Sequence, residues 1–406
     1  MDDFLIFDGA INSPEGYYAS GVSGGIKKTG NLDIALIVSD PPAISSSVFT
    51  RNIVKGHSLL RSMGLTGRFP CSGIVINSGN ANACVGQDGN NDADEIAAII
   101  AEALSCRPEN VLTASTGVIG KRLPMDSIRG GLIKAISSLT GEVEGGHLAE
   151  LAIMTTDTVP KESSVAFTAG GKKITLSGMA KGSGMIHPDM ATMIAILTTD
   201  CNISQELLDL ALKSVVDRSF NRISVDGDTS VCDMVTLLAN GCAHNQQISD
   251  KGSRDYRKFL KALEIVSTDL AKSIASDGEG ATKLIEIRVF NAKNKADALA
   301  VARAVAKSPL VKTAFFGEDA NWGRILTAAG YSGAEFDPEK CEIRLGSISV
   351  YSEGKALQFS EAEAKDILKE HDITITIDLN AGDSDEIMWT CDFSYDYVKI
   401  NGSYRT

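Results

Sequence analysis

The stretch spanning residues 178–200 limits what this chain can fold into more than any other part of it. Its first half is rich in glycine, and Pro188 blocks a helix there. The apolar run from Met193 to Leu197 predicts a buried strand directly afterwards. The sequence therefore predicts a loop-to-strand junction at Ala191-Thr192, with Thr192 at the start of the strand.

A chain cut at this junction would begin with Thr192, and an N-terminal threonine carries its own catalytic base. Its hydroxyl is the nucleophile and its α-amino group can accept the hydroxyl proton. An α-amine has an unperturbed pKa of about 7.7 to 8.0, so a large fraction is neutral near physiological pH. No histidine is required, which suits a chain with five histidines, and His187 is given no catalytic role.

The junction closely resembles the processed-threonine signature of the ornithine acetyltransferases (glutamate N-acetyltransferases) of arginine biosynthesis. Further blocks similar to that family recur in order along essentially the whole chain, at residues 21–28, 76–84, 115–120, 153–158, 218–230, 277–283, 321–324 and 395–406. The resemblance implies an acyltransferase that cleaves itself between Ala191 and Thr192, giving an α chain 1–191 and a β chain 192–406. It would then carry acetyl from N-acetylornithine to glutamate on Thr192.

The resemblance also implies roles for particular residues. Thr116 and Gly117, after a predicted strand, match the pair that stabilises the oxyanion, which needs backbone or hydroxyl donors. The implied substrate contacts are Thr155, Lys181, Thr192, Glu279, Asn401 and Thr406.

The types of two of these residues suit an amino-acid substrate. Lys181 is a flexible point charge for a carboxylate, and Glu279 lies between two glycines, where it can reach an ammonium group. The neighbouring Thr156 leaves the threonine assignment open by one residue. Residues 392–400 are predicted to form a strand that holds the tail in place, and residues 226–228 and 321–324 are assigned to scaffold and loop positioning.

Composition narrows the class of protein. The 406 residues are 43% hydrophobic and 22% charged, which is ordinary for a globular protein. A formal net charge of −13 argues against a nucleic acid or an anionic membrane as partner. The eight cysteines contain no Cys-x-x-Cys and no zinc spacing, so we expect reduced, mostly buried thiols, no metal and no cofactor. The acidic N-terminus and the lack of a long apolar run predict a cytoplasmic protein.

Apolar periodicity predicts a mixed α/β fold of sheets sandwiched by helices, with a smaller C-terminal α/β domain. We expect a catalytic core over residues 1–283 and the second domain over 284–406. The predicted strands cover residues 34–38, 74–77, 111–115, 193–197, 231–238, 285–290, 341–350 and 373–377. The predicted helices cover residues 93–104, 205–218 (capped by Ser204), 254–276 and 296–307.

Two other functions remain open from the residues alone. An N-terminal-nucleophile aminopeptidase or amidohydrolase would use the same threonine but give the acyl group to water. An uncleaved binding protein would use Ala191-Thr192 as a plain loop-to-strand junction. Phosphate-binding motifs fail on spacing, because Gly182-x-Gly184 lacks the third glycine of Gly-x-Gly-x-x-Gly. The resemblance further implies a heterotetramer of two α and two β chains, and leaves open whether acetyl-coenzyme A is a second donor.

Overall fold

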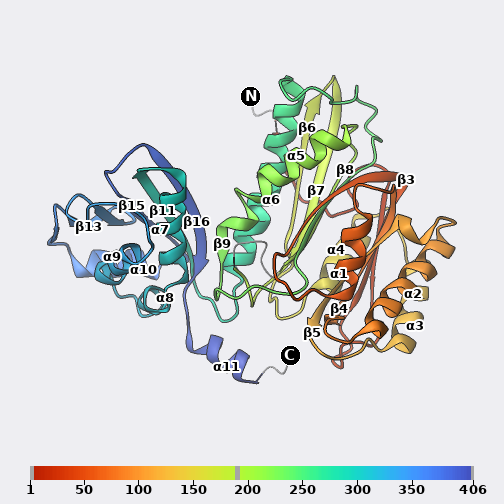
Figure 1. The fold of residues 1–406 in the computed structure, drawn as a ribbon, viewed down its shortest axis with the longest axis horizontal. Helices are drawn as coiled ribbons and strands as arrows, with labels where there is room; N and C mark the ends of the chain where they lie inside the picture. The colour runs from red at the N-terminus through yellow and green to blue at the C-terminus, as the bar shows by residue number, and fades with distance from the viewer. Residues whose placement is uncertain (1–3, 188–192, 404–406) are drawn as a thin grey trace.

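The computed structural model describes residues 4–187 and 193–403, and within them the chain forms two mixed sheets with helices packed on both (Figure 1). This confirms the predicted α/β class. Ala191, Thr192 and Thr406 lie outside the described residues. No helix in the described ranges is long and apolar enough to cross a membrane.

The larger sheet has nine strands in the order β1-β6-β7-β8-β10-β3-β4-β5, with β2 paired to β3. Strand β3 joins its two halves, because its first part pairs with β2 and β4 and its last part pairs with β10. The strands are β1 Phe4–Phe7, β2 Tyr17–Val22, β3 Ile34–Phe49, β4 Cys71–Asn80, β5 Val111–Val118, β6 Glu162–Ala169, β7 Lys172–Lys181, β8 Ile194–Thr199 and β10 Met234–Ala239.

Alternating side chains bury both faces of this sheet, as the period of two in a strand requires. In β8, Ala195 and Leu197 join a core with α5 and α6, whereas Ile194 and Ile196 join a second core that includes residues of α1 and α4. Helices α2 and α3 cover the outer face of β3 and β4 through a further core. The helices are α1 His57–Leu65, α2 Gln87–Ala103, α3 Met125–Ser137, α4 Val143–Ile153, α5 Gln205–Val216 and α6 Arg254–Ser276.

The second sheet has seven strands in the order β14-β13-β12-β15-β11-β16-β9, and its residues share a separate core with the C-terminal helices. Its strands are β9 Ile223–Ser224, β11 Leu284–Ala292, β12 Glu342–Leu345, β13 Ile348–Ser352, β14 Lys355–Ala356, β15 Asp372–Asp378 and β16 Ser384–Cys391. The helices are α7 Lys295–Lys307, α8 Pro309–Phe316, α9 Trp322–Gly330 and α10 Glu361–Lys369. Strand β9 precedes residue 283 but pairs with β16, so a segment from the predicted catalytic core forms the edge of the second sheet.

The structure has a helix or strand of the predicted kind at every predicted range except 392–400, but several bounds differ and other elements, such as β6, β7, α3 and α4, were not predicted. Strand β3 continues to Phe49, α2 begins at Gln87, and the predicted strand over residues 341–350 is two strands, β12 and β13. Helix α6 has the predicted bounds, and the Ser204 side chain accepts a hydrogen bond from the Leu207 N–H at 3.4 Å, as a cap of α5 should. The predicted strand 231–238 begins later, at Met234, because residues 231–233 belong to the preceding loop.

The predicted strand over residues 392–400 is wrong. Strand β16 ends at Cys391, and residues Tyr395–Ser403 form helix α11. Phe393, Tyr395 and Tyr397 alternate as in a strand, but Phe393 and Tyr397 are also four residues apart. Their rings stack with centroids 4.6 Å apart where the chain enters the helix.

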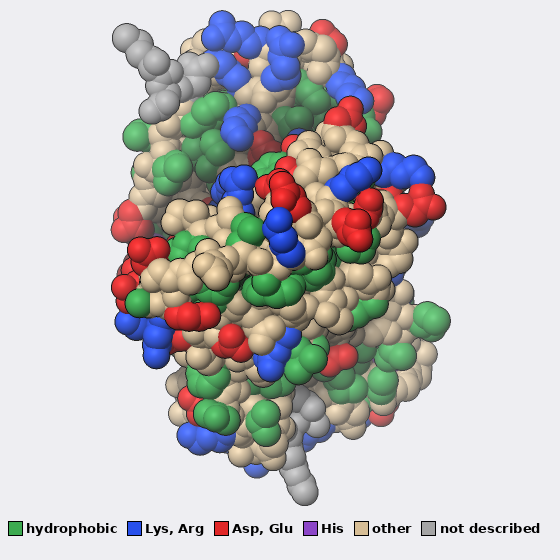
Figure 2. Space-filling view, turned by 90° about the vertical axis from the view of Figure 1, so that its left-hand side faces the viewer, with side chains coloured by type: hydrophobic (Ala, Val, Ile, Leu, Met, Phe, Trp, Pro, Cys, Tyr) green, Lys and Arg blue, Asp and Glu red, His purple; other side chains and the backbone are tan. Residues whose placement is uncertain are grey.

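On the face shown in Figure 2, acidic and basic side chains are interspersed with apolar ones. All eight cysteines are free, and five of them, Cys71, Cys201, Cys232, Cys341 and Cys391, are buried. This agrees with the expected reduced thiols.

Candidate active site

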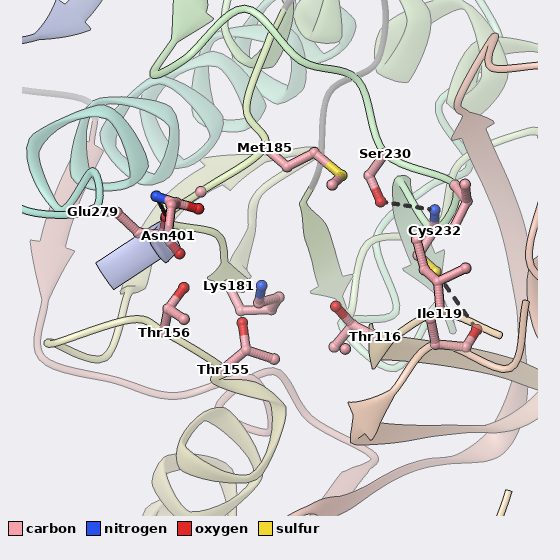
Figure 3. A pocket seen from close by; sticks show the side chains of 14 residues that line it. Thr116, Ile119, Thr155, Thr156, Lys181, Met185, Ser230, Cys232, Glu279 and Asn401 are labelled. Carbon is pink, nitrogen blue, oxygen red and sulfur yellow. Dashed lines mark hydrogen bonds between the residues drawn. The ribbon is translucent and has the colours of Figure 1, made fainter. Parts of the chain in front are cut away.

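One small pocket gathers most of the residues predicted from the sequence (Figure 3). It has a volume of about 100 Å³. Six of the predicted site residues line it: Thr116, Gly117, Thr155, Lys181, Glu279 and Asn401. They come from five places in the chain, namely the end of β5, the segment after α4, the end of β7, the segment after α6, and α11.

Thr116 and Gly117 lie within strand β5, near its end, and not in a loop after the strand. Gly117 has φ +128°, and a Cβ built on it would lie 2.4 Å from the carbonyl carbon of Gly79 in the neighbouring strand. Only glycine permits this approach of β4 and β5. Thr116 is 5% exposed and Gly117 is partly exposed, and both line the pocket.

Lys181 is the last residue of β7, and its side chain is 4% exposed. Its Nζ lies 3.8 Å from Oδ2 of Asp157, a fully buried carboxylate. Burial alone would raise the pKa of Asp157, but the charges of Lys181 and Lys161 outweigh it and hold that pKa well below its usual range. Of this carboxylate–ammonium pair, Lys181 lines the pocket (Figure 3), whereas Asp157 does not.

Glu279 and Asn401 lie together across the pocket from Cys232 (Figure 3). Nδ2 of Asn401 donates a hydrogen bond to Oε2 of Glu279 at 2.8 Å, so α11 reaches the site although residues 392–400 form no strand. A Cβ on Gly184 would lie 2.4 Å from the Glu279 carboxyl group. The glycine-rich loop thus serves close approach at this position.

Thr155 and Thr156 both line the pocket, so each of the two threonines left open by the sequence has access to a ligand. The lining residues that sequence reasoning did not select are Ala81, Ile119, Gly184, Met185, Ser230, Val231 and Cys232. Most offer apolar or backbone surface, which leaves little chemical signal in a sequence.

Two aspartate side chains, Asp226 and Asp233, hold the described chain on both sides of residues 188–192. Asp226 accepts hydrogen bonds from the N–H groups of Met185 at 2.6 Å and Ile186 at 2.9 Å, contacts that suit the loop positioning expected of residues 226–228. Asp233 accepts from the Met193 N–H at 3.1 Å, and burial raises the pKa of this fully buried acid well above its usual range. The expected scaffold role of residues 321–324 also fits, because the Asn321 side chain caps α9.

A larger cavity of about 1160 Å³ shares Thr155 with the pocket. Three lysines line it, Lys27, Lys28 and Lys121. Burial lowers the pKa of Lys27 to about 8. Within the described residues, no group of three or more His, Cys, Asp or Glu is arranged to hold a metal ion.

Fold and pocket together define a mixed α/β protein whose small site sets a lysine, a glutamate and threonine hydroxyls around one ligand-sized space. The chain belongs to the ArgJ family, whose model matches residues 18–406. Members of this family are acetyltransferases of arginine biosynthesis, so the resemblance found in the sequence is confirmed.

Relatives match over the full length of the chain. The arginine biosynthesis bifunctional protein ArgJ of Symbiobacterium thermophilum is 50% identical over 98% of this chain and 99% of its own. The protein of the same description from Caldanaerobacter subterraneus is 51% identical over 99% of this chain and 100% of its own. Among solved structures, that of ornithine acetyltransferase with ornithine from Mycobacterium tuberculosis is 37% identical, with a TM-score of 0.43 over 46% of this chain and 98% of that one.

Proposed function

We propose that this enzyme transfers acetyl from N-acetylornithine to glutamate through an acetyl ester on Thr192. The observation that carries the proposal is that six residues chosen from separate sequence blocks line a single pocket in a member of the ArgJ family. Their chemistry fits α-amino acids, since Lys181 suits an α-carboxylate and Glu279 suits the distal ammonium of ornithine.

Self-cleavage comes first in this scheme. The Thr192 hydroxyl attacks the Ala191 carbonyl carbon, the peptide C–N bond breaks to give an ester, and water hydrolyses that ester. The products are the α chain 1–191 and the β chain 192–406, with the Thr192 α-amino group set free. The side chains of Asp226 and Asp233, which hold the chain on either side, support a fixed geometry for this step.

Acetyl transfer then proceeds in two halves. Thr192 Oγ attacks the acetyl carbonyl of N-acetylornithine, the amide C–N bond breaks, and ornithine leaves with the hydroxyl proton relayed by the α-amine. The neutral amine of glutamate next attacks the acetyl ester, the C–Oγ bond breaks, and the proton lost by that amine is relayed by the Thr192 α-amine to Thr192 Oγ. Thr116 and Gly117 would stabilise each oxyanion, and Thr155, Asn401 and Thr406 would help to bind the substrates.

Intact mass spectrometry of the β chain tests the proposal. With N-acetylornithine alone, the wild-type β chain should gain one acetyl group, and glutamate should remove it. Thr192→Ala should give an uncleaved, inactive chain, whereas Thr192→Ser should keep part of both reactions because the hydroxyl survives. An active preparation of uncut chain would overturn the mechanism, and release of acetyl to water in the presence of glutamate would favour an amidohydrolase.

We propose acetyl-coenzyme A as a second donor, because Lys28 and Lys121 line the larger cavity beside Thr155 and suit its phosphates. The third lysine there, Lys27, already donates from Nζ to the carbonyls of Leu32 and Met154, both at 2.7 Å. Lys28→Ala/Lys121→Ala should weaken use of acetyl-coenzyme A by about tenfold, as expected for lost charge-assisted contacts. Lys340→Ala/Lys355→Ala is the matched control, with Lys340 in the turn before β12 and Lys355 in β14. Equal kinetics with acetyl-coenzyme A for both double variants would count against this binding mode.

We also propose an assembly, a division into domains and a cellular location for the enzyme. The cleaved chains would assemble as two α and two β chains, which native mass spectrometry would detect, and residues 1–283 and 284–406 would act as catalytic core and C-terminal domain. Free cysteines suit the reducing cytoplasm, where we place the enzyme.

A further inference from the structure

Four charged side chains form a buried network of ion pairs next to the pocket: Lys161, Asp157, Asp277 and Lys181. The Lys161 side chain is 0% exposed, and its Nζ donates hydrogen bonds to Asp157 Oδ1 at 2.9 Å and Asp277 Oδ2 at 2.6 Å. Asp157 continues the chain to Lys181. Of the four, only Lys181 lines the active-site pocket, and Asp157 lines the larger cavity beside it, so Asp157, Lys161 and Asp277 do not contact a ligand in the active-site pocket.

Asp157 holds the backbone of two segments near Lys181, the residue assigned to the substrate carboxylate. It accepts hydrogen bonds from the N–H of Thr155 at 2.8 Å and from the N–H of Gly182 at 2.6 Å. Gly182 follows Lys181 directly. One carboxylate therefore fixes the backbone of a pocket threonine, the start of the glycine-rich loop and the charge environment of the Lys181 ammonium.

Asp277 holds the backbone of the segments near Glu279, the residue assigned to the substrate ammonium. It accepts hydrogen bonds from the Thr158 N–H at 3.0 Å and from the Thr158 hydroxyl. Its backbone carbonyl accepts from the Ser183 hydroxyl at 2.7 Å, and the Ser183 carbonyl accepts from the Glu279 N–H at 3.2 Å. Lys161 thus links the segment that carries Lys181 to the segment that carries Glu279.

Stability alone is a poor reason for such a cluster. Burying ions carries a desolvation cost that ion pairing often does no more than offset, so well-packed apolar side chains would serve a core as well. Burial would lower the pKa of Lys161, but Asp157 and Asp277 outweigh it and raise that pKa, so Lys161 remains charged. What the charges provide beyond packing is a fixed direction for each hydrogen bond.

We infer that Asp157 and Lys161 are positioning residues that set the distance between Lys181 and Glu279, and hence which amino acids the pocket accepts. The choice of ligands for the test rests on the proposed function, in which N-acetylornithine and glutamate both carry the α-carboxylate assigned to Lys181. Neither residue touches the reacting atoms, so their loss should act on binding more than on the chemical step.

Asp157→Asn tests this inference against a purely structural role. It keeps one oxygen acceptor and removes the negative charge opposite Lys181. We expect KM for both substrates to rise about tenfold, as for a lost charge-assisted contact, while kcat changes by less than about threefold. The matched control is Glu386→Gln, which breaks another buried pair, Arg222–Glu386, whose side chains are 5% and 9% exposed. Both variants should lower Tm, but only Asp157→Asn should raise KM.

The double variant Asp157→Asn/Lys161→Met separates folding from positioning. It removes one charge of each sign and restores the zero net charge of the cluster, although Asp277 loses its ion pair with Lys161. It should therefore recover part of the Tm lost in Asp157→Asn while KM stays high. Recovery of KM together with Tm, or an unchanged KM in both variants, would overturn the inference.

Calorimetric titration of glutamate into each cleaved protein keeps this test independent of turnover. Weaker glutamate binding in the Asp157 variants but not in Glu386→Gln would support positioning even if the wild type failed to transfer acetyl. In that case the proposed function would fail and the inference would stand.

Discussion

At the scale of the residue, the sequence identified side chains that face a ligand far better than those that support them. Lys181 and Glu279 carry charges that suit a substrate, and both line the pocket. Lys161 gave no such signal, because one of its partners, Asp277, is 116 residues away and the pairing exists only in the folded chain. Asp157 and Asp277 did lie inside the family-like blocks, beside residues that were selected.

Gly117 allows a sharp test at this scale. Alanine there would place its Cβ 2.4 Å from the Gly79 carbonyl carbon, so β4 and β5 would have to separate. We expect Gly117→Ala to lose about 3 kcal/mol of unfolding free energy, from backbone strain and overpacking together, and most of its activity. Gly120 also has positive φ (+75°) but has nothing within 4 Å of a built Cβ.

Gly120→Ala should therefore cost about 1 kcal/mol, from backbone strain alone, and leave turnover intact. Chemical denaturation and steady-state kinetics of the two variants provide the comparison. Similar losses of activity in both would show that positive φ, and not the close approach to Gly79, makes Gly117 necessary.

At the scale of the element, the sequence predicted best where a cap and a long apolar period agree. Helix α6 begins after Ser253, whose side chain accepts from the Tyr256 N–H, and its period runs unbroken for 23 residues. Helix α11 has nine residues and no buried side chain, so its period could not outweigh the strand-like alternation of aromatic residues before and within it. Its place is set by tertiary contacts, including that of Asn401 with Glu279.

Asn401→Ala tests whether α11 serves the site. The change removes the hydrogen bond to Glu279, and we expect KM for N-acetylornithine to rise about tenfold, equivalent to about 1.4 kcal/mol, because the carboxylate loses its orientation. KM for glutamate should change much less, since glutamate has no distal ammonium. Lys399→Ala, which removes an exposed side chain paired with Asp396 on the same helix, is the control and should alter neither constant.

At the scale of the whole molecule, the net charge of −13 conceals carboxyl groups that sit in very different surroundings. Burial raises the pKa of Asp200 and of Asp226 to about 6, whereas Asp157 is held well below its usual value. Composition counts these groups alike, because only the folded chain determines which are desolvated and which are paired. The dependence of global stability on pH is therefore a property of the fold that the sequence could not supply.

Asp200 makes this dependence measurable. Its pKa is higher in the folded state than the usual 3.8, so the native protein binds more protons than the unfolded chain between about pH 4 and pH 6. Stability due to this group is thus greatest at low pH and falls as pH rises towards 6, where the buried carboxyl must ionise.

Asp200→Asn removes that ionisation and can still accept from the Thr175 N–H, which Asp200 binds at 2.8 Å. We expect the variant to gain stability relative to the wild type as pH rises from 4.5 to about 7.5. Asp250→Asn, in an exposed turn, serves as the control. Urea unfolding of all three proteins at both pH values decides the matter, since a wild-type-minus-variant difference that stays constant with pH would mean that Asp200 titrates alike in both states.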